Sequence, residues 1–170
     1  ADFPISGGQA GIIPTPEWKQ RVFDDPWRLG DTYNTAIGQY GFQVTPLQVM
    51  RFVSAIANGG MLMDAHLIRD EKPHSSRIGI TEGELTVIRE GMRAAVTDSG
   101  TAAALNIDGI ELSGKTGTAQ IGTRNQYMNS WVIGFWPHTQ PKYAFAVVLE
   151  KAPANTLSGA SPAMSKFFYW

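Results

Sequence analysis

Residues 113–120 constrain the fold of this chain more than any other segment. They read Ser-Gly-Lys-Thr-Gly-Thr-Ala-Gln, and the glycine and β-branched threonines at 116–118 disfavour a helix. On an extended strand, Thr116 and Thr118 would lie on one face because side chains alternate with a period of two. The segment therefore predicts a strand that presents one lysine and two hydroxyl groups.

Such a strand suits the anionic end of a peptide. Two hydroxyls two residues apart could hold one carboxylate, and Lys115 would bring a positive charge close to it. Gly117 leaves room for an extended peptide at the strand edge, and the Thr118 N–H could stabilise a carbonyl oxygen that becomes an oxyanion. We therefore take Lys115 and Thr118 as candidate catalytic residues, and Thr116, Gly117 and Thr118 as candidate substrate-binding residues. An ordinary turn rich in glycine and threonine, with a solvated lysine, is the alternative.

The same segment also fits the phosphate-loop pattern that begins at Gly109 and ends at Lys115-Thr116. That pattern requires a buried strand before Gly109 and a helix from Gly114. Residues 102–108 are instead typical of a short helix followed by a turn, and residues 116–122 contain two glycines. Nucleotide binding is therefore kept only as a remote alternative.

Three further segments carry a resemblance to a known family. They are Gly11-Ile12-Ile13-Pro14-Thr15-Pro16-Glu17-Trp18-Lys19, Pro26-Trp27-Arg28-Leu29-Gly30-Asp31-Thr32 and Ile37-Gly38-Gln39-Tyr40-Gly41-Phe42-Gln43-Val44-Thr45-Pro46-Leu47-Gln48. Lys115-Thr116-Gly117 matches the third motif of serine acyl transferases that act on D-alanyl peptides and β-lactams. In this order, and over nearly the whole chain, the segments resemble the class B penicillin-binding proteins, and within them the elongation branch.

Two motifs of that family are missing from the chain. The first, Ser-x-x-Lys, carries the nucleophile, and the second, Ser-x-Asn or Ser-x-Asp, carries a proton-relay hydroxyl. Neither spacing occurs in the 170 residues, and in the family both lie upstream of the segment that matches residues 13–16. We therefore expect residues 1–170 to be the C-terminal portion of a transpeptidase domain, inactive without the upstream, nucleophile-bearing portion.

The resemblance implies an α+β fold, the transpeptidase fold shared with serine β-lactamases, in which a five-stranded antiparallel sheet is flanked by helices. Three of the strands fall at about 111–121, at 130–136 and at 143–150. Their short connections favour antiparallel neighbours. Without the upstream portion we expect an exposed helix face and sheet edge, and hence an unstable or aggregation-prone chain.

Two longer helices are predicted from caps and apolar stripes. The first has Thr45 as its N-cap and Pro46 at its first position, and the second begins with a capping box of Thr81 and Glu84. Their stripes are Val49, Phe52, Val53 and Ile56, and Leu85, Ile88, Met92, Ala95 and Val96.

The remaining segments carry weaker patterns. Thr101 is expected to cap a short helix through Leu105, and Ser161 to start a C-terminal helix. Residues 1–43 are expected to form a mostly irregular surface layer, and residues 61–80 a short extended stretch and a loop.

Composition narrows the function classes. A net charge of −1 predicts no nucleic-acid partner, and the absence of cysteine excludes disulfides and thiolate metal sites. No apolar run approaches the roughly 20 residues that span a bilayer, and no signal peptide opens the chain. His66, His74 and His138 lack ligand spacing, so no metal is expected, and no cofactor is predicted.

Several other residues receive a structural interpretation. Asp24-Asp25 and Asp70-Glu71 are expected to be solvated loop charges. Gln39 and Tyr40 are expected to be structural, and Trp131, Phe135 and Trp136 to lie in the core or on a sheet face. Residues 124–127, in the loop after the motif strand, are candidates for a contact with substrate, because in the resembled fold that loop borders the cleft.

The resemblance implies a peptidoglycan D,D-transpeptidase that cross-links stem peptides through a serine acyl-enzyme and is inhibited by β-lactams. It also implies a periplasmic location with the membrane anchor outside this chain. The implied protein partners are the upstream half of the domain, a SEDS-family (RodA-like) glycosyltransferase and an elongation scaffold protein (MreC-like). A non-catalytic β-lactam sensor or scaffold relative is the second hypothesis.

Overall fold

The structure is a computed structural model that describes residues 9–67, 74–122, 124–156 and 159–169. The chain divides into two compact units, Ala1–Thr45 and Pro46–Trp170. No helix among the described residues is long and apolar enough to cross a bilayer.

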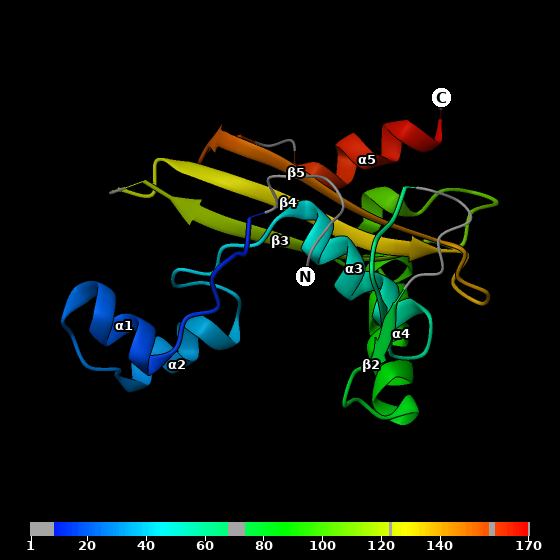
Figure 1. Ribbon diagram of the computed structural model, residues 1–170. Coiled ribbons are helices and arrows are strands. Elements are labelled where there is room, and N and C mark those ends of the chain that lie inside the picture. Colours follow the sequence, from blue (N-terminus) through cyan, green and yellow to red (C-terminus); the bar gives the residue numbers. More distant parts are fainter. Residues whose placement is uncertain (1–8, 68–73, 123, 157–158, 170) are drawn as a thin grey trace. The chain divides into compact units, whose positions relative to one another are not determined.

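Three strands form the main sheet of the second unit: β3 (Ser113–Ile121), β4 (Tyr127–Trp136) and β5 (Tyr143–Pro153) (Figure 1). Their order is β3-β4-β5, and both neighbouring pairs are antiparallel, which confirms the predicted arrangement. β4 begins three residues earlier than predicted and β5 ends three residues later. The missed part of β4 contains a register shift in its pairing with β5, between Met128 and Ser130, and it lies outside the apolar run of residues 131–136.

Two helices follow the predicted periodicity, α3 (Pro46–Ala57) and α4 (Glu82–Thr97). The predicted capping box of α4 is confirmed: the Thr81 hydroxyl accepts from the Glu84 N–H, and the Glu84 carboxylate accepts from the Thr81 N–H at 2.8 Å. Hydrogen bonds from the Thr81 hydroxyl and backbone lower the pKa of Glu84. Phe52 and Ile88, which the stripes included, are exposed, so the buried stripes are narrower than predicted.

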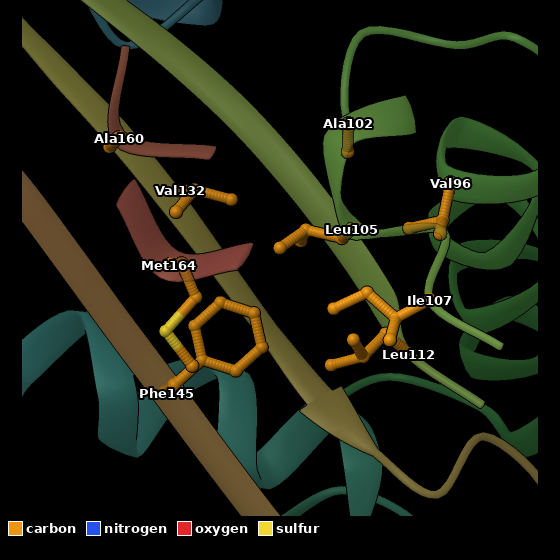
Figure 2. Packing of buried hydrophobic residues seen from close by; sticks show 9 residues of the cluster. All are labelled: Val96, Ala102, Leu105, Ile107, Leu112, Val132, Phe145, Ala160 and Met164. Atoms are coloured by element: carbon orange, nitrogen blue, oxygen red, sulfur yellow. The ribbon is translucent and has the colours of Figure 1, made fainter. Parts of the chain in front are cut away.

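The sheet has a hydrophobic cluster on each face. Phe135 and Val132 are three residues apart on β4 and therefore point to opposite faces. Phe135 packs with α3 and α4 in a cluster of Val53, Ile56, Ala57, Leu85 and Met92. On the other face, Val132 packs with residues from α4, from the short helix η1 (Ala103–Leu105), from β5 and from α5 (Ala160–Phe168). Figure 2 shows these side chains converging, with Leu105, Val132, Phe145 and Met164 directed into one cluster.

The predicted C-terminal helix is confirmed, whereas one predicted cap is wrong. α5 begins at Ala160, one residue before the predicted Ser161, and the Ala160 N–H donates to the hydroxyl of Ser130 on β4 at 2.9 Å. The Ser161 hydroxyl is buried and has no hydrogen-bond partner among the described residues. η1 has Ala102 as its N-cap, without a side-chain hydrogen bond, so Thr101 does not cap it. At α5, a contact from a distant strand takes the place of a local cap.

Part of the predicted loop between residues 61 and 80 is a second, two-stranded sheet. β1 (Met61–Met63) pairs antiparallel with β2 (Ser75–Arg77), and residues 68–73 lie outside the described residues. The turn into β1 is held by Asn58, whose amide side chain bonds the backbone N–H and C=O of Met61.

The first unit is more regular than predicted. Within residues 9–45 it contains α1 (Pro16–Phe23) and α2 (Leu29–Ala36), two helices that the expectation of a mostly irregular layer did not include. Each helix has only eight residues, too few for an apolar period to stand out. Thr15 caps α1 by accepting from the Trp18 N–H at 3.1 Å. The Thr15-Pro16 pair was a usable signal, because Thr45-Pro46 precedes α3 in the same way.

A buried lysine holds the first unit together. Lys19 is only 4% exposed, and its ammonium group lies 2.8 Å from the Asp25 carboxylate and 2.7 Å from the Asp31 carboxylate. Asp25 also pairs with Arg28. The expectation that Asp25 is a solvated loop charge is therefore wrong, while Asp70 and Glu71 lie outside the described residues. Removing one member of such a group leaves a buried charge unpaired, which is strongly destabilising.

These ion pairs predict that the first unit opens in acid. Arg28, then Lys19, lowers the pKa of Asp25, and Lys19 lowers the pKa of Asp31, both below the ordinary value of 3.8. Asp25 and Asp31, in that order, raise the pKa of Lys19. Depressed carboxyl pKa values give stability that is present at neutral pH and is lost as the pH falls below 3.8.

We expect amide protection factors in residues 16–36 to fall as the pH is lowered from about 4 to about 2, measured by hydrogen exchange and corrected for the intrinsic rate. In a Lys19→Met variant, protection should be lower at pH 7 and should change less with acid, because the Asp31 carboxylate has then lost its lysine partner. An equal pH dependence in the two proteins would contradict the assigned role of the ion pairs.

Candidate active site

The predicted motif lies on the outer strand of the main sheet. β3 runs from Ser113 through the motif and pairs with β4 in continuous register, and among the described residues no strand covers its other edge. Lys115, Gly117 and Thr118 are exposed and Thr116 is half-buried. The strand prediction is confirmed. The phosphate-loop geometry is contradicted, because a strand and not a helix follows Gly114.

The residues just before the motif anchor this strand. Leu112 and Ser113 are fully buried, and Gly114 is buried opposite Gly134 on β4. A side chain at Gly114 would lie 3.0 Å from the Leu105 side chain. The strand therefore enters from the core and emerges at Lys115, which fixes where the motif is presented.

The Lys115 ammonium group contacts the backbone of its own strand. It donates to the carbonyl oxygen of Thr116 at 2.5 Å, and the side chain is exposed. An ammonium group has three donors, so this single hydrogen bond leaves capacity for an anionic ligand. The arrangement keeps a positive charge at the edge of β3.

The two threonines of the motif differ in their surroundings. The Thr116 hydroxyl donates to the hydroxyl of Thr101 at 2.7 Å. Thr118 is exposed and lies opposite Ser130 in the strand register. A side chain at Gly117 would meet only the Cβ atom of Trp131, at an ordinary 3.6 Å. Steric contact within the described residues therefore does not require glycine there, and its predicted role in admitting a peptide stays a prediction.

Comparison with known proteins identifies the family. The model of the penicillin binding protein transpeptidase domain matches residues 3–169. The chain belongs to this family. Peptidoglycan D,D-transpeptidase MrdA of Acinetobacter baumannii is 32% identical to this transpeptidase-family chain over 184 residues. A structure of penicillin-binding protein PBP2 from Helicobacter pylori covers 96% of the chain with a TM-score of 0.80 and 32% identity.

The transpeptidase-family chain spans only part of these relatives. The match with the Acinetobacter protein includes 94% of this chain but only 27% of that protein. The match with the Helicobacter PBP2 structure includes 30% of the PBP2 chain. A second Helicobacter structure, a complex between PBP2 and MreC, covers 97% of this chain with a TM-score of 0.77 and 31% identity. The α+β fold is thus that of the family.

The loop after the motif strand is shaped by its own contacts. The Gln126 side chain accepts from the Arg124 N–H at 3.0 Å, and Asn125 adopts a positive φ of 52°. Tyr127 is already the first residue of β4. A substrate contact by residues 124–127 stays a prediction. The side-chain oxygen of Gln126 already accepts a hydrogen bond within the loop.

A serine, a histidine and a glutamate lie together elsewhere in this transpeptidase-family chain. Ser113 Oγ is 2.8 Å from His138 Nδ1, and His138 Nε2 is 3.3 Å from Glu90 Oε1. The order resembles a catalytic triad, but Ser113 is 0% exposed, so no substrate reaches its oxygen. Glu90 and His138 line a cavity of about 330 Å³ with Thr86, Arg89, Thr139 and Pro141. The group ties β3, α4 and the β4–β5 connection together.

The aromatic predictions are confirmed. Phe135 is fully buried, and Trp136 packs against the cluster on the opposite sheet face. Tyr40 makes edge contacts with the Trp18 and Trp27 rings, which supports a structural role.

Sequence reasoning missed Thr101 as a neighbour of the motif. Fifteen residues separate it from Thr116, and no local pattern connects a loop threonine to a strand.

Proposed function

We propose that this chain is the C-terminal portion of the transpeptidase domain of a peptidoglycan D,D-transpeptidase, and that the nucleophile-bearing portion lies upstream. The observation that carries the proposal is Lys115-Thr116-Gly117-Thr118 on the exposed edge strand β3 of a transpeptidase-family fold. The chain itself has no Ser-x-x-Lys, so the reaction requires a serine from the rest of the protein.

In the proposed reaction the upstream serine attacks the carbonyl carbon of the penultimate D-alanine of a stem peptide. A C–O bond forms, the C–N bond to the terminal D-alanine breaks, and the serine proton passes to the leaving amine. An amine of a neighbouring stem peptide then takes the acyl group, which releases the serine and completes the cross-link. Forming an acyl-enzyme divides one difficult step into two easier ones.

Residues of β3 serve this chemistry as donors. Lys115 would hold the carboxylate of the terminal D-alanine and support proton transfer, with hydroxyl hydrogen bonds from Thr116 and Thr118 to the same carboxylate. The Thr118 N–H would be one donor to the oxyanion. Gly117 would let the extended peptide lie along the strand edge. β-Lactams carry a carboxylate beside a reactive amide carbonyl and would occupy the same positions.

The full-length protein tests the function directly. Incubation with a fluorescent penicillin should label it covalently, and a synthetic stem pentapeptide should release D-alanine. Labelling without D-alanine release or cross-linking would favour the second candidate, a β-lactam sensor or scaffold. No labelling and no release would contradict the proposal.

Removing the charge of Lys115 should slow acylation. A hydrogen bond to a charged group contributes about 1.5–3 kcal/mol, so Lys115→Ala should lower the second-order rate of penicillin acylation by about ten- to a hundredfold. The matched control is Lys142→Ala, which removes an exposed lysine between β4 and β5. Equal rates for both variants would refute the role of Lys115.

The family also bears on location and partners. We infer that the intact protein acts on the periplasmic face of the inner membrane, with its anchor outside this chain. The Helicobacter PBP2–MreC complex supports a scaffold partner of that class. A SEDS-family glycosyltransferase is the second partner that we propose. Co-purification of the full-length protein with each candidate, from detergent extracts, tests these assignments.

A further inference from the structure

A threonine outside the motif contacts it directly. Thr101, in the connection between α4 and η1, accepts a hydrogen bond from Thr116 of β3, with 2.7 Å between the two hydroxyl oxygens. Thr101 is exposed and Thr116 half-buried. The pair therefore lies at the surface beside Lys115, where the proposed function places the substrate carboxylate.

The chain on both sides of Thr101 is fixed. A side chain at Gly100 would lie 2.5 Å from the Ala95 carbonyl oxygen, so this glycine is pressed against α4. Ala102 is fully buried, and its N–H donates to the same Ala95 oxygen at 3.0 Å. Thr101 therefore extends from a backbone that is anchored before and after it, and its hydroxyl is held in place before any ligand arrives.

Hydroxyl chemistry gives this pair one donor for a third group. Each hydroxyl has one proton, and within the pair the O–H group of one threonine donates to the hydroxyl oxygen of the other. With Thr116 donating, the proton of Thr101 remains for an anion. Thr116 alone cannot give its proton to both Thr101 and a carboxylate.

We propose that Thr101 is a further substrate-binding residue, which donates its hydroxyl proton to the carboxylate held by Lys115. The inference rests on the proposed function and assigns to Thr101 the hydrogen bond that the motif alone would give to Thr116. A carboxylate at this position would then contact Lys115, Thr101 and Thr118. The competing interpretation is that the hydroxyl pair only ties the α4–η1 connection to β3.

The two interpretations differ in their dependence on the charge of the ligand. In the full-length protein, Thr101→Val removes the hydroxyl and keeps the side-chain shape, whereas Thr101→Ser keeps the hydroxyl. We would measure second-order acylation rates with benzylpenicillin and with its neutral methyl ester. Thr97→Val is the matched control, because Thr97 is an exposed α4 threonine whose hydroxyl bonds Arg93 and Asp98.

We expect Thr101→Val to slow acylation by benzylpenicillin about tenfold or more and to leave the rate with the ester unchanged. Thr101→Ser should restore most of the rate, and Thr97→Val should match the parent protein. Equal losses with both compounds, or no loss with either, would overturn the inference and leave Thr101 a structural tie. A parent protein that neither compound acylates would overturn the proposed function itself, and the assignment of Thr101 with it.

Discussion

A Thr118→Pro variant of the intact protein should be acylated by penicillin about 100- to 1,000-fold more slowly than the parent protein. Proline has no backbone N–H, so the substitution removes the proposed oxyanion donor on β3. Loss of one such donor costs about 2.7–4 kcal/mol of transition-state stabilisation. The measurement is the second-order rate of fluorescent-penicillin labelling, compared at equal concentrations of folded protein.

Two controls separate the N–H from other effects of this substitution. Thr118→Val removes the hydroxyl and keeps the N–H, so its loss should be no more than that of one hydrogen bond to a carboxylate. A melting curve of the proline variant shows whether β3 is still paired with β4, because an edge strand tolerates proline only where its N–H faces away from the sheet. A folded proline variant with the parental labelling rate would refute the oxyanion assignment.

Phe135→Ala should destabilise the domain by about 3–5 kcal/mol. Phe135 is fully buried and packs with Val53 of α3 and Leu85 of α4, so truncation opens a cavity between the sheet and both helices. Because whole domains are stable by only about 5–15 kcal/mol, a loss of this size is a large part of the total. Denaturant unfolding of the full-length protein measures the change.

The matched control is Phe167→Ala on α5. Phe167 is 62% exposed, although its ring contacts that of Phe168, so its truncation should cost about 1 kcal/mol or less. A Phe135→Ala variant with the same midpoint as Phe167→Ala would show that the cluster around α3 and α4 contributes little to stability.

The regular elements of the second unit were predictable because their signals are local. β4 and β5 contain apolar runs, the three strands are separated by short connections, and α4 carries its capping box in the sequence itself. The same local reasoning placed the start of α5 one residue late and assigned Thr101 a cap that it does not form. The N-terminus of α5 is satisfied by Ser130 from β4, and Thr101 bonds a strand residue, so tertiary contacts override the local pattern.

The first unit escaped prediction for a different reason. α1 and α2 are too short for periodicity, and Lys19, Asp25 and Asp31 are spread over loop-like sequence. Nothing local distinguishes a buried lysine from a solvated one, because the ion pairs form only once both helices are in place. For the candidate site, the motif located Lys115 and its strand, whereas its partner Thr101 became visible only in three dimensions.

The glycines around the motif carry a consequence for mutational scans of this region. Gly114 faces Gly134 across the strands, and a methyl group at 134 would sit 2.1 Å from the Ser113 carbonyl oxygen. Substitution at Gly134 should abolish activity by misfolding the sheet, so an inactive alanine clone at this position carries no information about catalysis. At Gly117, where a methyl group fits, an alanine clone that folds normally but turns over poorly would report on the chemistry itself.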